Sequence, residues 1–339
     1  MAKTLWTSSG GPADGTGGTA YTQNATYYSV AANGGLVAQT TANEAFAKIT
    51  QRAAGTARSL LVNVSANALA DDSTFRTRLN GANGGMSVTI TAGTTGQFSD
   101  SSGSDVIASG DTYNYQIVVP LDDPGFTFVA NVASVTFAAT TSTVIRYAAV
   151  DFSDLSSGST YYIGMANCST SGSGHTTEAW HSFDTNAAAT YQNLYVYVSV
   201  NSGATATSVF LRQNGADTTV TVSCTGATTG SFEDAFATTG HSVTTAANDD
   251  MNYSIVSNNQ AAFNIEIISI EATSTDSTSH SIIDVDTALG SVGAGLTRYA
   301  CVGGGGFMNG TEAVMKNKMA FAATTSNLTI YVVTDTITA

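Results

Sequence analysis

The sequence predicts an all-β protein built from tandem jelly-roll-like β-sandwiches, and three observations lead to this fold class. A 134-residue internal repeat runs through two copies and half of a third. Apolar and polar residues alternate through the best-matched segments, as they do in half-buried strands. The 339 residues also include 14 Tyr and 14 Phe but only 11% charged residues, a composition that favours strands over helices.

The repeat divides the chain into units 1–134, 135–268 and a half copy, 269–339. Identical residues recur at the repeat spacing, namely Glu44, Glu178 and Glu312, and likewise Leu60, Leu194 and Leu328. Two whole copies and a half form an array of repeated structural units. Such an array is not typical of an enzyme with a single active site. We therefore expect a building or docking protein and no catalytic function.

Strand character is clearest in the segments 60–67, 194–201 and 328–335, which match in register. In the first of them Leu60, Val62 and Val64 point to one side of the strand, because successive side chains alternate between faces. The equivalent positions hold Leu, Val or Ile in all copies, whereas the opposite face changes. The constant face predicts the core, and the changing face is where copies can diverge to meet partners.

Turn signals separate these segments from further strands. Asn80-Gly81 recurs as Asn214-Gly215, and this dipeptide tolerates the positive φ angles of a tight hairpin turn, although we expect these loops to be longer than two residues. Later strands are predicted at 113–117 and 251–255. Counting such segments indicates roughly eight or nine short strands per repeat, which favours a β-sandwich of jelly-roll type.

The half copy 269–339 poses a packing problem, because half a sandwich leaves an apolar face and strand edges uncovered. One solution is that sandwiches form out of phase with the repeat, as units 68–201 and 202–335. The other is that the half copy exchanges strands with a neighbouring subunit. We favour contact between subunits, and thus a homo-oligomer.

Composition excludes several classes of partner. The net charge of −14 arises because only 11 residues are Lys or Arg, too few for the basic stripe that nucleic-acid binding requires. An anionic membrane surface is disfavoured for the same reason. The sequence contains no apolar run of about 18 residues that would span a membrane. The first residues lack an apolar signal region, so we expect no secretory signal.

No group of residues predicts a catalytic, cofactor or zinc site. The four histidines, His175, His181, His241 and His280, fall at unrelated repeat positions, unlike zinc ligands. Cys224 matches the core-facing Ile90 and is predicted to be a buried thiol, while Cys168 and Cys301 lie in loop-like segments. The Gly/Ser runs at 170–175 and 303–306 lack the flanking elements of a nucleophile elbow or phosphate-binding loop.

Paired acidic residues raise the question of calcium, which binds oxygen-rich loops. The pairs are Asp71-Asp72, Asp122-Asp123, Asp249-Asp250 and Asp284/Asp286. Of these acids only Asp249 matches a carboxylate in the other copy, Asp111. We expect solvated turns and no cofactor, with a structural calcium ion as the alternative; nothing indicates a glycosidase pair.

Two arginines are more informative. Arg78 and Arg212 occupy the same repeat position, just before the Asn-Gly turn, and Glu44 and Glu178 recur as well. We expect an Arg–Glu pair that locks adjacent strands in each sandwich. Charged groups more than about 6 Å apart would rule this out.

A family resemblance rests on these motifs. The strand 193–201, the Phe210–Gly215 turn segment and the Thr-Thr-Gly-x-Phe-x-Asp segments at 94–100 and 228–234 resemble repeated β-sandwich modules of tailed-bacteriophage virion proteins. The resemblance covers most of 26–270, and the final strand extends it to 294–335. It implies a virion role such as capsid decoration, head fibre or tail appendage, with no catalytic residues and with assembly in the host cytoplasm.

The function expected from the sequence is therefore that of a non-enzymatic virion structural protein, whose partners are its own copies and capsid or other virion proteins. One alternative is a receptor- or glycan-binding appendage that contacts a host-surface glycan through exposed aromatic residues, Tyr161, Tyr162, Tyr195 and Tyr197. Another alternative is a bacterial extracellular filament or surface-layer protein.

Overall fold

The structure is a computed structural model of the chain. It describes residues 3–10, 19–21, 24–36, 39–40, 43–120, 128–140, 144–152, 155, 158–165, 176–178, 183–185, 187–234, 236–257, 262–274, 299–300 and 308–309. Nearly all regular elements among these residues are strands, as the alternating sequence predicts. No helix in the described part of the chain is both long and apolar enough to cross a membrane.

The first sandwich consists of two facing sheets. One contains β10 (Gly96–Ile107), β7 (Gly55–Asn67), β12 (Phe128–Ala139) and β1 (Lys3–Gly10), with β2 (Thr19–Tyr21) paired to β12. The other contains β9 (Ala82–Ile90), β8 (Ser73–Leu79), β11 (Thr112–Val119), β3 (Ala25–Val30) and β5 (Gln39–Thr40), with β6 (Ile49–Thr50) paired to β11. A 3-10 helix, η1 (Glu44–Ala47), precedes β6.

The strand order of this sandwich is that of a jelly roll. Of its eight main strands in chain order, the sixth, third, eighth and first form one sheet, and the second, seventh, fourth and fifth form the other. Two Greek-key connections produce this arrangement. The predicted fold class, an all-β protein of jelly-roll-like sandwiches, is confirmed.

The second sandwich repeats this order with different strands. One sheet contains β13 (Val144–Phe152), β22 (Phe263–Ser274), β16 (Ala189–Asn201) and, along the far edge of β16, β19 (Gly230–Asp234) and β20 (Ser242–Thr245). The facing sheet contains β14 (Thr160–Ile163), β21 (Asp250–Val256), β17 (Thr207–Gln213) and β18 (Ala216–Cys224), with β15 (Phe183–Asp184) paired to β21. A short helix, α1 (Phe236–Thr239), separates β19 from β20.

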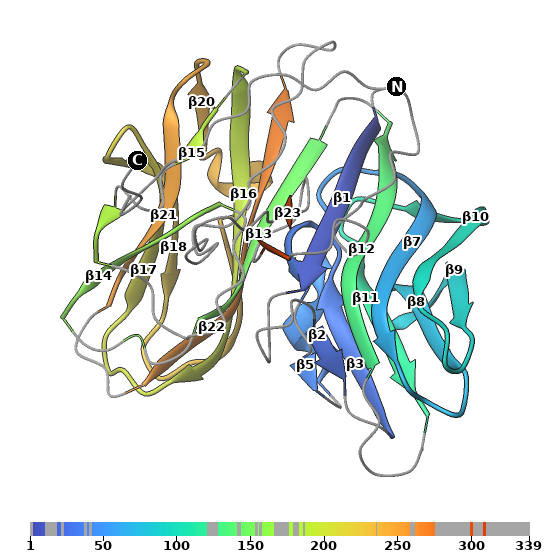
Figure 1. Ribbon diagram of the computed structural model, residues 1–339. Coiled ribbons are helices and arrows are strands. Elements are labelled where there is room, and N and C mark those ends of the chain that lie inside the picture. The colour runs from blue at the N-terminus through green and yellow to red at the C-terminus, as the bar shows by residue number, and fades with distance from the viewer. Residues whose placement is uncertain are drawn as a thin grey trace, which may run out of the picture.

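One strand joins the two jelly rolls into a continuous 11-stranded sheet. β4 (Asn33–Leu36) pairs in parallel with β1 on one side and with β13 on the other. Figure 1 shows the result, with the blue-to-green first jelly roll beside the green-to-orange second one and β1 and β13 facing the middle.

Each sandwich takes its main strands from one stretch of the chain, from β1 to β12 (3–139) or from β13 to β22 (144–274). β7, which ends at Asn67, pairs with β10 and β12 of its own copy, so units 68–201 and 202–335 do not describe the structure. Positions 134 and 268 fall inside β12 and β22, because each jelly roll closes with a whole strand that continues past the repeat boundary. Of the predicted half copy, β22 takes the first residues, and only β23 (Tyr299–Ala300) and β24 (Met308–Asn309) are described beyond it.

Each jelly roll has its own core. The predicted inner face is confirmed: Leu60, Val62 and Val64 are buried in the first core, and the equivalent Leu194, Val196 and Val198 in the second. Each fully buried large side chain contributes about 1.5–3 kcal/mol of transfer free energy. Trp6 of β1 stacks on Phe137 at a centroid distance of 4.2 Å, which ties the N-terminal strand to the closing strand.

Cys224 lies in the second core and is fully buried, as predicted. Burial raises the pKa of its thiol to about 12. Cys168, Cys301, His175, His181 and His280, together with the runs 170–175 and 303–306, lie outside the described residues.

Candidate functional site

The predicted Arg–Glu pair exists in the first jelly roll. Leu79 pairs with Ala82, so the hairpin loop consists of Asn80 and Gly81 alone, with φ angles of 52° and 77°. Arg78 Nε donates to Glu44 Oε1 at 3.0 Å and Arg78 Nη2 to Glu44 Oε2 at 3.3 Å. Nη2 also donates to the carbonyl oxygen of Gly81. The guanidinium therefore fastens the turn to the 3-10 helix that carries Glu44.

The second jelly roll has the same lock. Arg212 Nε donates to Glu178 Oε1 at 2.6 Å, Nη2 donates to Glu178 Oε2 at 3.2 Å, and Nη2 also reaches the carbonyl of Gly215. Nη1 of Arg78 also donates to Asn83, and Nη1 of Arg212 donates to Asp217. Bidentate Arg–carboxylate pairs combine strength with defined geometry. In the first copy the glutamate lies in a 3-10 helix and not in the adjacent strand, so the pair holds the hairpin turn against that helix and does not lock two strands as predicted.

Electrostatics support this structural role. Burial by itself would raise the pKa of Glu44, but the hydrogen bonds and positive charges of Arg78 and Lys48 outweigh it, and the pKa is lowered overall. The hydrogen bond to Glu44 in turn raises the pKa of Arg78. Tyr28 lies under this guanidinium at 6.0 Å from the ring centroid, within the range of a cation–π contact.

The acidic turns behave as internal acceptors. Asp111 accepts a hydrogen bond from Asn80 Nδ2 at 2.7 Å, and Asp249 accepts one from Asn214 Nδ2 at 2.8 Å. These side-chain hydrogen bonds, followed by backbone ones, lower the pKa of both carboxyl groups. Among the residues that the structure describes, no three His, Cys, Asp or Glu side chains come together as metal ligands would.

A second pair of repeated aspartates escaped the sequence reasoning, although it ends the Thr-Thr-Gly motif. Asp100 Oδ1 accepts the backbone N–H of Ser102 and of Gly103, each at 2.9 Å, and Oδ2 accepts that of Ser87 at 3.1 Å. These hydrogen bonds, that of Gly103 first, hold the pKa of Asp100 at about 2 despite partial desolvation. The repeat position of Asp100, shared with Asp234, was the available signal.

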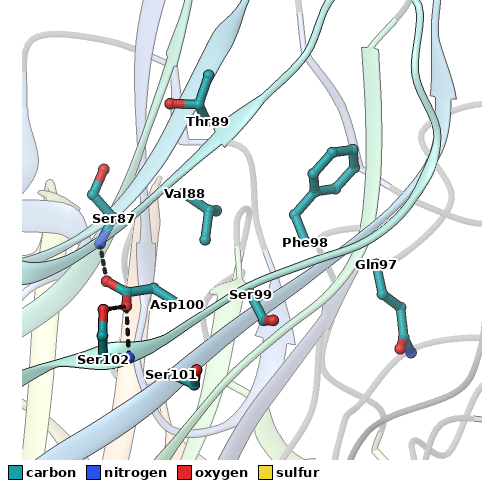
Figure 2. Close-up of a pocket in the computed structure, with 9 residues that line it drawn as sticks. All are labelled: Ser87, Val88, Thr89, Gln97, Phe98, Ser99, Asp100, Ser101 and Ser102. Carbon is teal, nitrogen blue, oxygen red and sulfur yellow. Dashed lines mark hydrogen bonds between the residues drawn. The ribbon is translucent and has the colours of Figure 1, made fainter.

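An open groove lies between β9 and β10, beside this aspartate. Figure 2 shows its lining: Ser87, Val88, Thr89, Gln97, Phe98, Ser99, Asp100, Ser101 and Ser102. The hollow has a volume of about 580 Å³. Its lining is mainly hydroxyl and amide, with the carboxylate of Asp100 accepting the Ser102 hydroxyl at 2.9 Å, and it contains no basic residue.

The joint between the two jelly rolls is a further site that sequence reasoning missed. The Arg52 guanidinium pairs with the Glu233 carboxylate, and the Arg52 backbone N–H donates to Glu271 Oε1 at 2.9 Å. Phe46 of η1 packs on Tyr197 of β16 with ring centroids 5.4 Å apart. First-copy residues thus cover the outer face of the sheet in the second copy.

A small apolar cluster completes this joint. Val30, Ala32 and Ile49 from the first copy pack against Ala148, Tyr195 and Ile267 from the second. Divergence between the copies was the signal for it, because Tyr195 and Tyr197 replace Leu61 and Asn63 of the first copy, and Glu233 replaces Ser99.

The expected aromatic platform for a glycan is not exposed. Tyr195 is 5% exposed within the joint, and Tyr161 is 7% exposed in the second core. Tyr197 is partly covered by Phe46, and Tyr162 lies against Arg212 at 5.4 Å. Alternation along a strand predicts two faces but does not distinguish solvent from another sandwich. These tyrosines therefore pack within the molecule and form no exposed platform.

No protein-family model matches the sequence, and no curated protein is significantly similar to it. Among solved structures, a xanthan lyase from Paenibacillus aligns with a TM-score of 0.23 and 16% identity, over 68% of this chain but only 22% of the lyase. The major capsid protein P2 of bacteriophage PM2 aligns with a TM-score of 0.22 and 10% identity, over 80% of this chain and 98% of its own.

The VP2 subviral particle of infectious bursal disease virus gives a TM-score of 0.22 at 14% identity, over 80% of this chain and 72% of the VP2 chain. TM-scores at this level do not establish a common fold. The similarities include viral capsid proteins, but they do not assign a function to this chain.

Proposed function

We propose that the protein is a non-enzymatic structural component of a virion, in a coat, decoration or fibre. The observation that carries this proposal is the use of its repeated polar residues. Arg78 and Arg212 hold turns, Asp111 and Asp249 hold loops, and Asp100 holds a bulge. Each has hydrogen-bond partners within the chain, as expected of a rigid building block.

The architecture supports the same proposal. Eight-stranded jelly rolls are a common architecture of viral capsid domains and of lectins. Here two of them share one sheet and an interface of apolar and charged contacts, so that the pair acts as one stiff unit. The unit is rigid and has few charged residues, but its net charge is −14. Such a unit suits an exposed and soluble coat.

The native mass of the purified chain, measured by light scattering with electron microscopy of the same samples, tests the proposal. A closed trimer or hexamer supports a decoration or spike, and open-ended filaments support a fibre. A single-chain mass at all concentrations, with no binding to capsid particles in a co-sedimentation assay, would contradict a role in virion architecture.

A glycan-binding appendage is the second candidate, and the observation that favours it is the groove between β9 and β10. Its hydroxyl and amide lining matches the hydrogen-bonding groups of neutral sugars, whereas Tyr161 and Tyr195 are buried. A glycan array on the wild type and on Gln97→Ala tests it, with the exposed Asp71→Ala as control. Binding that only Gln97→Ala weakens would support this function.

A further inference from the structure

The 11-stranded sheet ends in two edges among the described strands, β10 at one end and β19 with β20 at the other. An edge strand exposes unpaired N–H and C=O groups, and these groups are a template for adding a strand from another chain. Each of these edges carries an aspartate at the same repeat position, Asp100 and Asp234. The two carboxylates make related contacts.

At the first edge the carboxylate holds a bulge. The register of β10 against β7 breaks between Asp100, which is opposite Leu60, and Ser104, which is opposite Arg58. Asp100 Oδ1 accepts the N–H groups of both Ser102 and Gly103 within this extra loop. A bulge bends and twists the edge, so a straight incoming strand cannot form continuous pairs with β10.

The Asp100 carboxylate also contacts β9, the edge strand of the opposite sheet. Its Oδ2 accepts the N–H of Ser87, and Asp105 accepts that of Gly85. The two strands come so close that a Cβ at Gly103 would collide with the Gly85 carbonyl oxygen. Two edge donors of β9 are therefore already satisfied inside the sandwich.

In the second jelly roll the equivalent aspartate, Asp234, also contacts the edge strand of the facing sheet, but a short helix takes the place of the bulge. Asp234 Oδ2 accepts the N–H of Thr221 in the edge strand β18 at 2.9 Å. Its Oδ1 accepts the hydroxyl of Thr239 at 2.6 Å, which anchors α1 between β19 and β20. Asp234 is 3% exposed. Here the inserted helix interrupts the edge in place of the bulge.

We infer that Asp100 and Asp234 close both ends of the long sheet against strand addition. Any association of copies of the chain would therefore use sandwich faces and loops and leave these edges unpaired. The inference does not depend on the virion role, because it concerns any self-association of this chain. It also limits the strand exchange expected from the sequence to segments other than β10, β19 and β20.

The test compares Asp100→Ala with the wild type, and uses Asp111→Ala as a control for losing a hydrogen-bonded turn carboxylate. Light scattering over a concentration series reports size, and hydrogen exchange reports the amides of 96–107. We expect Asp100→Ala to form larger species in which exchange of these amides slows roughly tenfold, while Asp111→Ala keeps the size of the wild type. Unchanged size and exchange in Asp100→Ala would overturn the inference.

A milder variant covers the case in which Asp100→Ala does not fold. Asp100→Asn keeps an acceptor for Ser102 and Gly103 but presents an NH2 group to the Ser87 N–H, so that only this edge donor is released. Faster exchange at Ser87 is expected in dilute solution, where the variant is unassembled, and the mass should increase with concentration. Wild-type exchange at Ser87 with wild-type mass would contradict the inference, and so would assembly of the wild type that protects 96–107.

Discussion

Two adjacent core tyrosines on β11 show how a single atom decides the effect of a residue. Tyr113 and Tyr115 are both fully buried. The Tyr113 hydroxyl donates to Asp105 Oδ2 at 2.8 Å, whereas the Tyr115 hydroxyl has no partner in the described structure. Burial raises the pKa of both phenols, so both are neutral and both are hydrogen-bond donors at neutral pH.

The two Tyr→Phe substitutions should therefore have opposite consequences. Tyr113→Phe removes a donor from a buried carboxylate and should cost about 1–3 kcal/mol of unfolding free energy. Tyr115→Phe removes an unpaired buried hydroxyl and should be neutral or stabilising, by up to about 1 kcal/mol. Urea denaturation of the two variants is the measurement, and equal losses would show that the hydrogen bond to Asp105 contributes nothing.

The repeated arginine has its own matched control. Arg78→Ala leaves Glu44 with a charge that is 13% exposed and without its bidentate partner. The loss of charged hydrogen bonds should reduce the unfolding free energy by about 2 kcal/mol. Arg58 on β7 is exposed, and Arg58→Ala should change the unfolding free energy by less than about 0.5 kcal/mol. Chemical denaturation of both variants would contradict the lock if the two losses were the same.

At the scale of elements, the joint links η1 and β6 of one jelly roll to β16 and β22 of the other. Its charged contact, between Arg52 and Glu233, is only partly buried, with side chains 30% and 26% exposed. Such a pair contributes modestly, because water screens it and its long side chains lose entropy. The apolar cluster around Tyr195 and Ile267 should carry most of the stability of the joint.

A double-mutant cycle measures the charged contact. Arg52→Ala and Glu233→Ala should each destabilise the joint, and their coupling energy should be about 0.2–1 kcal/mol. The variant with the charges reversed, Arg52→Glu with Glu233→Arg, should recover part of the stability that the single alanine substitutions lose. Thermal unfolding reports stability and small-angle scattering reports the arrangement of the jelly rolls. Strictly additive losses would mean that the two side chains do not interact in solution.

At the scale of the whole molecule, carboxylates should set the acid limit of stability. Hydrogen bonds from Gly103, Ser87 and Ser102 lower the folded-state pKa of Asp100 from 3.8 to about 2. A depressed pKa contributes stability that is fully present above the unfolded pKa and lost as pH falls through the folded one. The pKa values of Asp111 and Asp249 are lowered as well.

Stability should therefore decline as pH falls from about 4 to about 2. Unfolding free energies measured along a pH series check this, and Asp100→Asn should show a shallower decline over this interval because its side chain does not titrate. An identical decline in wild type and Asp100→Asn would assign the acid sensitivity to other groups.

The continuous sheet should also couple the unfolding of the two jelly rolls. Gly34 in β4 lies opposite Ser8 of β1 and Ala148 of β13. A proline there removes an N–H group from the parallel ladder, so Gly34→Pro should split one calorimetric transition into two. A single transition in the variant would indicate that the apolar joint alone couples the two jelly rolls.

Much of the fold and the Arg–Glu locks could be predicted from the sequence. The inner face of Leu60 follows from alternation, and the pairing of Arg78 with Glu44 follows from recurrence at one spacing. The joint could not be predicted in the same way. Arg52 and Glu271 are far apart in the chain, and no local pattern indicates that they meet. Asp100 lay in a recognised motif, but its role depends on Ser87 in the facing sheet.

The sequence by itself determined the strands, the core face and the position of the Asn-Gly turns, but not their two-residue length, because the first three depend on neighbouring residues and on a pattern repeated along the chain. Only the tertiary structure decided that β4 joins two sheets and that the first jelly roll buries Tyr195. It also decided that an aspartate at each edge, Asp100 or Asp234, accepts hydrogen bonds from backbone N–H groups. These features depend on which surfaces meet. A strand with alternating residues has the same pattern whether its outer face meets water or another sandwich.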